Sequence, residues 1–124
     1  MAKQAENGGK GSITIFHNPA CGTSRTVLAA LRERGVEPNV VEYLKVGWTR
    51  PQLQGLLNAM NARPRDILRT RGTPAEALGI TAESSDDKIL AAMVAQPILV
   101  ERPIVVTPKG TALCRPAEKL QALL

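Results

Sequence analysis

Residues Ser12–Arg25 read SITIFHNPACGTSR, a short strand pattern followed by a polar turn that contains the first of two cysteines. The β-branched residues of SITIF alternate as in a strand, and HNPACG is typical of a turn. From Thr23 to Arg34 apolar residues recur at helical spacing, and Gly35 is suited to end the helix. Asn39–Leu44 (NVVEYL) predicts a second strand. The strand, helix and strand together predict a βαβ unit with parallel strands and a right-handed crossover.

The middle of the chain is predicted to be helical. Thr49 is a good N-cap with Pro51 just inside the helix, and an apolar stripe follows it as far as Met60. Two shorter segments are expected, one opened by Pro64 and one running from Thr73-Pro74 to near Gly79. Another helix is expected to begin at Ser84 or Ser85, with two aspartates in its first turn, and to stop at Pro97.

The last third of the chain returns to a strand pattern. Pro103–Thr107 and Thr111–Cys114 flank a Pro-Lys-Gly turn, which predicts a β-hairpin, and a terminal helix is expected from Pro116. The order of elements predicts an α/β fold of the thioredoxin-like (glutaredoxin-like) kind. It would have three layers, α/β/α, with a mixed four-stranded sheet and an inserted helical segment.

Bulk composition fits one globular domain. The chain has 124 residues, a net charge of +5 and 2% aromatic residues, so its core is aliphatic and a single-stranded nucleic-acid surface is disfavoured. The excess positive charge indicates either a solvated face or a field that attracts anionic substrates. Residues 1–11 are predicted to be a disordered tail, and residues 12–124 a single domain. No signal peptide, membrane span or disulfide framework is evident, so we expect a cytoplasmic, monomeric protein that binds neither membrane nor nucleic acid.

Cys21 is predicted to be a nucleophilic thiol at a helix N-terminus. A thiol reacts as the thiolate, and an unperturbed cysteine, with a pKa of about 8.5, is mostly protonated at neutral pH. The free N–H groups and the positive end of the helix dipole at a helix N-terminus both favour the anion. We therefore expect Cys21 to attack a small oxyanion or a disulfide. The alternative is an ordinary turn in which Cys21 is structural.

The residues around Cys21 suggest an anion site. The backbone N–H groups of Gly22, Thr23 and Ser24, with the two hydroxyls, form the kind of cradle that binds tetrahedral oxyanions. His17, at the end of the strand, could help to ionise the thiol, or could simply cap the strand end.

The motif C-G-T-S has Ser24 where a dithiol oxidoreductase has its second cysteine. An adduct on Cys21 would then need an external thiol to complete the reaction. Cys114 lies in a predicted strand, and a role as a small buried apolar residue is favoured over a resolving role.

Three separated segments resemble the ArsC family of glutathione/glutaredoxin-linked arsenate reductases. They are ITIFHNPACGTSR, RPRDILRTRGTP and PILVERPIVVTPKGTALCRP, in the family's order along the chain. The resemblance covers nearly all of the chain after the N-terminal tail. Because three segments match, the likeness is more specific than the cysteine loop alone would be.

The resemblance implies roles for individual residues. The catalytic cysteine matches Cys21, the loop histidine and serine match His17 and Ser24, and the substrate-handling arginines match Arg69, Arg102 and Arg115. It also implies that Pro103 follows a cis peptide bond. A guanidinium offers a fixed fork of donors that suits an oxyanion with several oxygens.

The function implied is reduction of arsenate to arsenite by the Cys21 thiolate, with glutathione as co-substrate and glutaredoxin as partner. No metal or bound cofactor is expected. One alternative is a glutathione-dependent thiol/disulfide reductase of the same fold with little arsenate activity. The other is an Spx-type redox-sensing regulator that binds RNA polymerase, although such regulators usually carry C-x-x-C.

Overall fold

The computed structural model describes residues 12–124, so the predicted disordered tail, residues 1–11, lies outside the described residues. The chain divides into two compact units, one made of residues 12–43 and 102–124 and the other of Leu44–Glu101. The second unit corresponds to the predicted helical insertion. That residues 12–124 form one domain stays a prediction.

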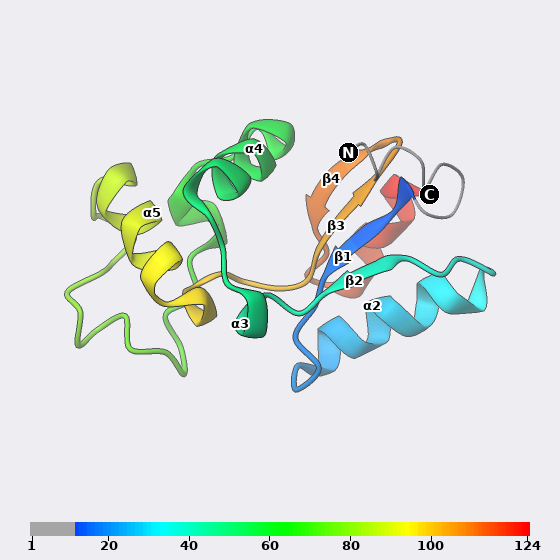
Figure 1. Ribbon diagram of the computed structural model, residues 1–124, viewed down its shortest axis with the longest axis horizontal. Coiled ribbons are helices and arrows are strands. Elements are labelled where there is room, and N and C mark those ends of the chain that lie inside the picture. The colour runs from blue at the N-terminus through cyan, green and yellow to red at the C-terminus, as the bar shows by residue number, and fades with distance from the viewer. Residues whose placement is uncertain (1–11) are drawn as a thin grey trace. The chain divides into compact units, whose positions relative to one another are not determined.

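The first unit is built on a mixed four-stranded sheet. Its strands are β1 (Thr14–Phe16), β2 (Asn39–Val41), β3 (Ile104–Thr107) and β4 (Gly110–Leu113), in the order β2-β1-β3-β4 (Figure 1). β1 is parallel to β2 and antiparallel to β3, and β3 is antiparallel to β4. The predicted α/β fold, βαβ unit and C-terminal hairpin are therefore confirmed.

One face of this sheet carries two helices. α2 (Gly22–Glu33) and the 3-10 helix η4 (Ala117–Leu123) contact each other and share a core with the strands. The buried residues of this core are Ile13, Ile15, Val27, Leu31, Val105, Cys114, Leu120 and Leu123. Sheet and helices are thus two layers of the first unit, and the third layer of the α/β/α arrangement stays a prediction.

The ends of two elements in the first unit differ from the sequence prediction. The predicted strand Asn39–Leu44 stops at Val41, and the chain turns into the short helix α3 (Tyr43–Val46), which buries Tyr43 completely. The terminal helix is present but has 3-10 winding. Three residues per turn place Leu120 and Leu123, three positions apart, on the same buried face.

The second unit contains two α-helices with the predicted start signals. α4 (Arg50–Met60) begins at Thr49, whose side chain accepts a hydrogen bond from the Gln52 N–H while the Gln52 side chain accepts one from the Thr49 N–H. α5 (Asp86–Ala95) begins at Ser85, so the structure selects Ser85 over Ser84 as the N-cap. Two 3-10 helices complete the unit, η2 (Pro64–Ile67) and η3 (Pro97–Leu99).

The predicted short helix from Thr73 to Gly79 is wrong, because this segment forms a series of turns. The Thr73 hydroxyl donates to the carbonyls of Arg69 and Thr70, and it accepts from the Ala75 N–H. A seven-residue segment gains too few helical hydrogen bonds to offset the cost of nucleating a helix, and side-chain bonds of this kind compete with the helix.

Two kinds of feature are absent from the part of the chain that the structure describes. None of the helices within residues 12–124 has the length and apolar character needed to cross a membrane. The same residues contain no group of three or more His, Cys, Asp or Glu side chains that could hold a metal ion.

Candidate active site

Cys21 is the N-cap residue of α2 and lies at the end of the turn that follows β1. Its backbone is extended, with φ −96° and ψ 125°, and its carbonyl accepts the Arg25 N–H at 3.0 Å. Its own N–H donates to the Asn18 carbonyl at 3.0 Å, which closes the turn. The residue is 7% exposed. The predicted position of the thiol at the start of the helix is therefore confirmed.

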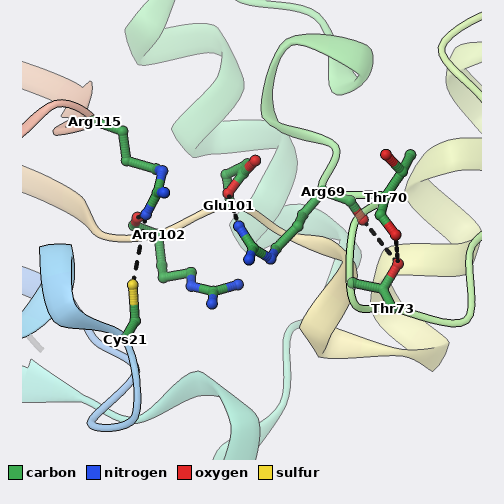
Figure 2. Close-up of polar contacts among 7 residues, drawn as sticks. All are labelled: Cys21, Arg69, Thr70, Thr73, Glu101, Arg102 and Arg115. Carbon is green, nitrogen blue, oxygen red and sulfur yellow. Dashed lines mark hydrogen bonds and ion pairs between the residues drawn. The ribbon is translucent and has the colours of Figure 1, made fainter.

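Two of the three predicted arginines lie at this thiol. The Arg115 Nη1 is 3.5 Å from the Cys21 Sγ and 3.2 Å from the Arg102 carbonyl oxygen (Figure 2). The Nε and Nη1 atoms of Arg102 are buried and have no hydrogen-bond partner among the described residues. Buried guanidinium N–H groups without partners are costly, so they mark a place suited to an anion.

Each of these arginines precedes a proline through a cis peptide bond, Arg102-Pro103 and Arg115-Pro116. The first was predicted from the family resemblance and is confirmed; the second was not predicted.

The surroundings of Cys21 favour its thiolate. Burial by itself raises the pKa of the thiol, but the backbone N–H of Ser24 and the Arg102 and Arg115 guanidinium groups outweigh burial and lower the pKa to about 7. About half of the thiol is then ionised at neutral pH. The helix N-terminus and the arginines act together, which the sequence had suggested only separately.

His17 acts on the loop through Ser24. The His17 Nδ1 and the Ser24 Oγ are 2.7 Å apart, and the Ser24 Oγ also accepts the Asn18 N–H at 3.1 Å. All three residues are buried, and burial is the main cause of a lowered pKa of His17, which therefore stays neutral at neutral pH. The Ser24 hydroxyl is thus occupied inside the loop, while its N–H faces the sulfur. Substrate contact by this hydroxyl stays a prediction.

Asn18 is a residue that the sequence analysis missed. Its side-chain oxygen accepts the Ala20 N–H at 2.9 Å, and it is 5% exposed. The Asn-Pro pair carried the signal, since asparagine before proline often starts a turn of this kind. Gly22 and Thr23, the other predicted substrate-binding residues, are the first two residues of α2. Gly22 is exposed and Thr23 is half-buried. The N–H groups of both lie in the first turn, where a helix has no partners for them within itself.

Arg69, the third predicted arginine, belongs to the second unit. Its Nη1 donates to the Glu101 carboxylate at 3.0 Å, and the two side chains are 16% and 24% exposed. The structure thus gives Arg69 a carboxylate partner that the sequence analysis did not identify. A lone glutamate 32 positions away gives no local sequence signal.

Cys114 is fully buried in the core of the first unit. Burial raises the pKa of its thiol to about 11, against a smaller opposing effect of Lys119. A thiol with this pKa is protonated at neutral pH, which agrees with the predicted packing role.

A cavity of about 430 Å³ lies against α2. The described residues that line it are His17, Pro19, Arg25, Leu28, Ala29, Arg32 and Glu33, and Cys21 is not among them. The anion site at the thiol is therefore a different feature of this unit, defined by the donors around the sulfur.

Comparisons with known proteins agree with this geometry. The model of the ArsC family matches residues 16–123. The chain is 54% identical over 113 residues to the arsenate reductase ArsI2 of Synechocystis, covering 90% of this chain and 81% of that protein. It is 46% identical over 114 residues to the arsenate reductase of Escherichia coli strain K12, covering 91% and 81%.

The fold also matches solved structures. The arsenate reductase from Vibrio cholerae superposes with a TM-score of 0.84 at 33% identity, covering 90% of this chain and 97% of that one. The chain therefore belongs to the ArsC family.

Proposed function

We propose that this protein reduces arsenate to arsenite with Cys21 as the nucleophile. The observation that carries the proposal is a thiol with a pKa of about 7 beside two guanidinium groups, one of which has buried N–H groups without partners among the described residues. A nucleophile and counter-charge for an oxyanion thus lie together. The names of the relatives at 54% and 46% identity support arsenate as that oxyanion.

The first step is attack of the Cys21 thiolate on arsenic. A sulfur–arsenic bond forms and one arsenate oxygen leaves as water after taking up protons. Arg102 and Arg115 stabilise the negative charge on the remaining oxygens, and the N–H groups of Gly22, Thr23 and Ser24 contribute at the helix end. Arg69 is proposed as a third arginine that binds the oxyanion. His17 positions Ser24 and so acts as a positioning residue.

Glutathione is proposed as the thiol that completes the reduction. Its thiolate attacks the Cys21 sulfur, the sulfur–arsenic bond breaks, and its electron pair reduces As(V) to As(III), which leaves as arsenite. Glutaredoxin then attacks the glutathione sulfur and frees Cys21. Ser24 in place of a second cysteine and the buried, protonated Cys114 both support an external thiol. We also propose that the protein works as a cytoplasmic monomer without metal or bound cofactor.

A coupled assay tests this function. The protein is mixed with arsenate, glutathione, glutaredoxin, glutathione reductase and NADPH, and the arsenate-dependent loss of NADPH is followed. A parallel reaction replaces the glutathione and glutaredoxin with thioredoxin and thioredoxin reductase. Turnover only in the first reaction is expected, whereas turnover only in the second would overturn the proposed reductant and leave arsenate reduction standing.

The alternatives have their own outcomes in the same experiment. A protein that reduces a glutathione mixed disulfide but gives no arsenate-dependent rate is a thiol/disulfide reductase of the same fold. A protein inactive in both assays that is retained by RNA polymerase in a pull-down is a regulator. Either result would refute arsenate reduction.

A further inference from the structure

The second unit contains an arginine–carboxylate pair whose side chains are largely shielded from water. In the Arg69–Glu101 pair the side chains are 16% and 24% exposed. Three further pairs in the described chain have side chains between 46% and 81% exposed: Arg32–Glu37, Arg50–Asp87 and Arg63–Asp86. Exposed pairs contribute little, whereas a pair shielded from water restrains its arginine more strongly.

The backbone holds both partners of this pair in place. Leu68 and Val100 form an isolated antiparallel bridge, the Arg69 N–H donates to the Leu99 carbonyl at 2.7 Å, and the Glu101 N–H donates to the Ile67 carbonyl at 2.8 Å. In this register Arg69 and Glu101 are diagonal neighbours on one face of the bridge. The Arg69 carbonyl is held in addition by the Thr73 hydroxyl at 3.0 Å (Figure 2).

The partner of Arg69 is also the residue directly before Arg102 in the chain. The boundary between the two units falls between these two residues, so the Arg69–Glu101 hydrogen bond lies wholly within the second unit. A free arginine side chain must lose much rotamer freedom when it binds an anion. The Glu101 carboxylate restricts that freedom in advance, because it accepts a hydrogen bond from Nη1 of the guanidinium.

We propose that Glu101 is a positioning residue that holds the Arg69 guanidinium ready to bind the substrate oxyanion. This inference rests on the proposed function, in which Arg69 contacts arsenate. Glu101 itself does not contact the anion, because a carboxylate would repel it. Its contribution is therefore to the affinity for arsenate, through Arg69, and depends on the hydrogen bond between their side chains.

A double-mutant cycle on arsenate kinetics tests the proposal. Glu101→Ala is expected to raise the KM for arsenate about tenfold with kcat reduced less than threefold, and Arg69→Ala to raise KM by at least as much. The double variant should be no worse than Arg69→Ala alone. Independent, multiplying effects of the two substitutions on KM would overturn the proposal.

Two further variants separate positioning from general destabilisation. Glu101→Gln keeps an oxygen that accepts the Arg69 N–H and should stay within about threefold of the wild-type KM. Glu37→Ala is the matched control, because it removes the glutamate from the exposed Arg32–Glu37 pair. Glu37 lies beyond the C-terminal end of α2, whose N-cap is Cys21, so this variant should leave KM unchanged. A Gln variant as impaired as the Ala variant, or a Glu37→Ala variant equally impaired, would contradict positioning by Glu101.

A binding measurement keeps this inference separate from the proposed function. The rate at which iodoacetamide alkylates Cys21 is measured at about pH 8, where the thiolate predominates, with increasing arsenate. Arsenate should protect the wild-type thiol, and protection should need about ten times more arsenate in Glu101→Ala. Protection without turnover would refute the reductase but still test Glu101; equal protection in both proteins would refute the role of Glu101.

Discussion

The two cysteines of the first unit are both buried, yet their thiols have opposite acidities. The pKa of Cys21 is lowered to about 7, and that of Cys114 is raised to about 11. Burial alone raises the pKa of either thiol, because it disfavours the charged form. Only Cys21 has a helix N–H and two guanidinium groups around its sulfur. The difference indicates that, between two buried thiols, the donors around the sulfur decide the direction of the pKa shift.

Removal of the two thiols should give the largest contrast. Cys21→Ser is expected to lower arsenate-dependent turnover by at least about 10⁴-fold, since a serine hydroxyl is not ionised at neutral pH. Cys114→Ser should leave turnover within about threefold of the wild type, because that thiol is protonated and buried. Both are measured in the coupled NADPH assay. Loss of activity in both folded variants would mean that two thiols take part in the reaction.

Removal of the positive charges around Cys21 should make its pKa more like that of Cys114. Arg102→Ala and Arg115→Ala are each expected to raise the pKa of Cys21 and to lower kcat/KM about 10²-fold. Each substitution removes a guanidinium whose positive charge stabilises the thiolate and the developing oxyanion. The pKa is measured from the ultraviolet absorbance of the thiolate as a function of pH. Arg34→Ala, at the exposed C-cap of α2, is the control and should change neither quantity.

The pH dependence of alkylation should separate the two thiols in the wild-type protein. The rate at Cys21 should rise with pH through a midpoint of about 7, while Cys114 should stay unmodified until the protein unfolds. Peptide mass spectrometry after a short iodoacetamide pulse gives both rates. A common midpoint at the pKa of a free thiol would show that the arginines do not act on Cys21.

The same two pKa values predict opposite effects on stability. The pKa of Cys21 is lower in the folded than in the unfolded chain, so its stabilising contribution is present in full above about pH 9 and is lost as the pH falls through about 7. The pKa of Cys114 is higher in the folded chain, so the free energy of unfolding should fall as the pH rises above about 9. Urea unfolding of Cys21→Ser and Cys114→Ser across this range isolates each contribution.

Loss of the Ser24 hydroxyl should have the smallest effect on the thiol. Ser24→Ala leaves the buried Asn18 N–H and the His17 ring without their common partner, and is expected to cost about 1–3 kcal/mol in the free energy of unfolding. The pKa of Cys21 should change little, because the Ser24 N–H remains. Thr26→Ala, on the exposed side of the same helix, is the control. A large rise in the Cys21 pKa would instead give the hydroxyl a direct role at the sulfur.

Local sequence signals predicted the elements with clear start and stop residues. Thr49 and Ser85 begin helices, and Gly35 follows the end of α2 with a φ of +80° that glycine tolerates. The segment from Thr73 to Gly79 was predicted wrongly, because a side chain bonding to its own loop competes with helix formation and carries no periodic pattern. The same holds for single residues. Cys21 was identified from the loop around it, whereas the Glu101 partner of Arg69 was not, because it lies 32 positions away in the chain.

The sequence by itself determined the chemistry available: one cysteine at a helix start, a serine in place of a second thiol, and the arginines directly before Pro103 and Pro116. These follow from local spacing, because a turn and the first turn of a helix involve residues close together in the chain. The tertiary structure decided which residues meet. Arg115 reaches Cys21 across 94 positions, and Glu101 reaches Arg69 across 32. Such pairs depend on sheet register and on which face of each element is buried, and the contact with Arg115 is one of those that distinguish Cys21 from Cys114.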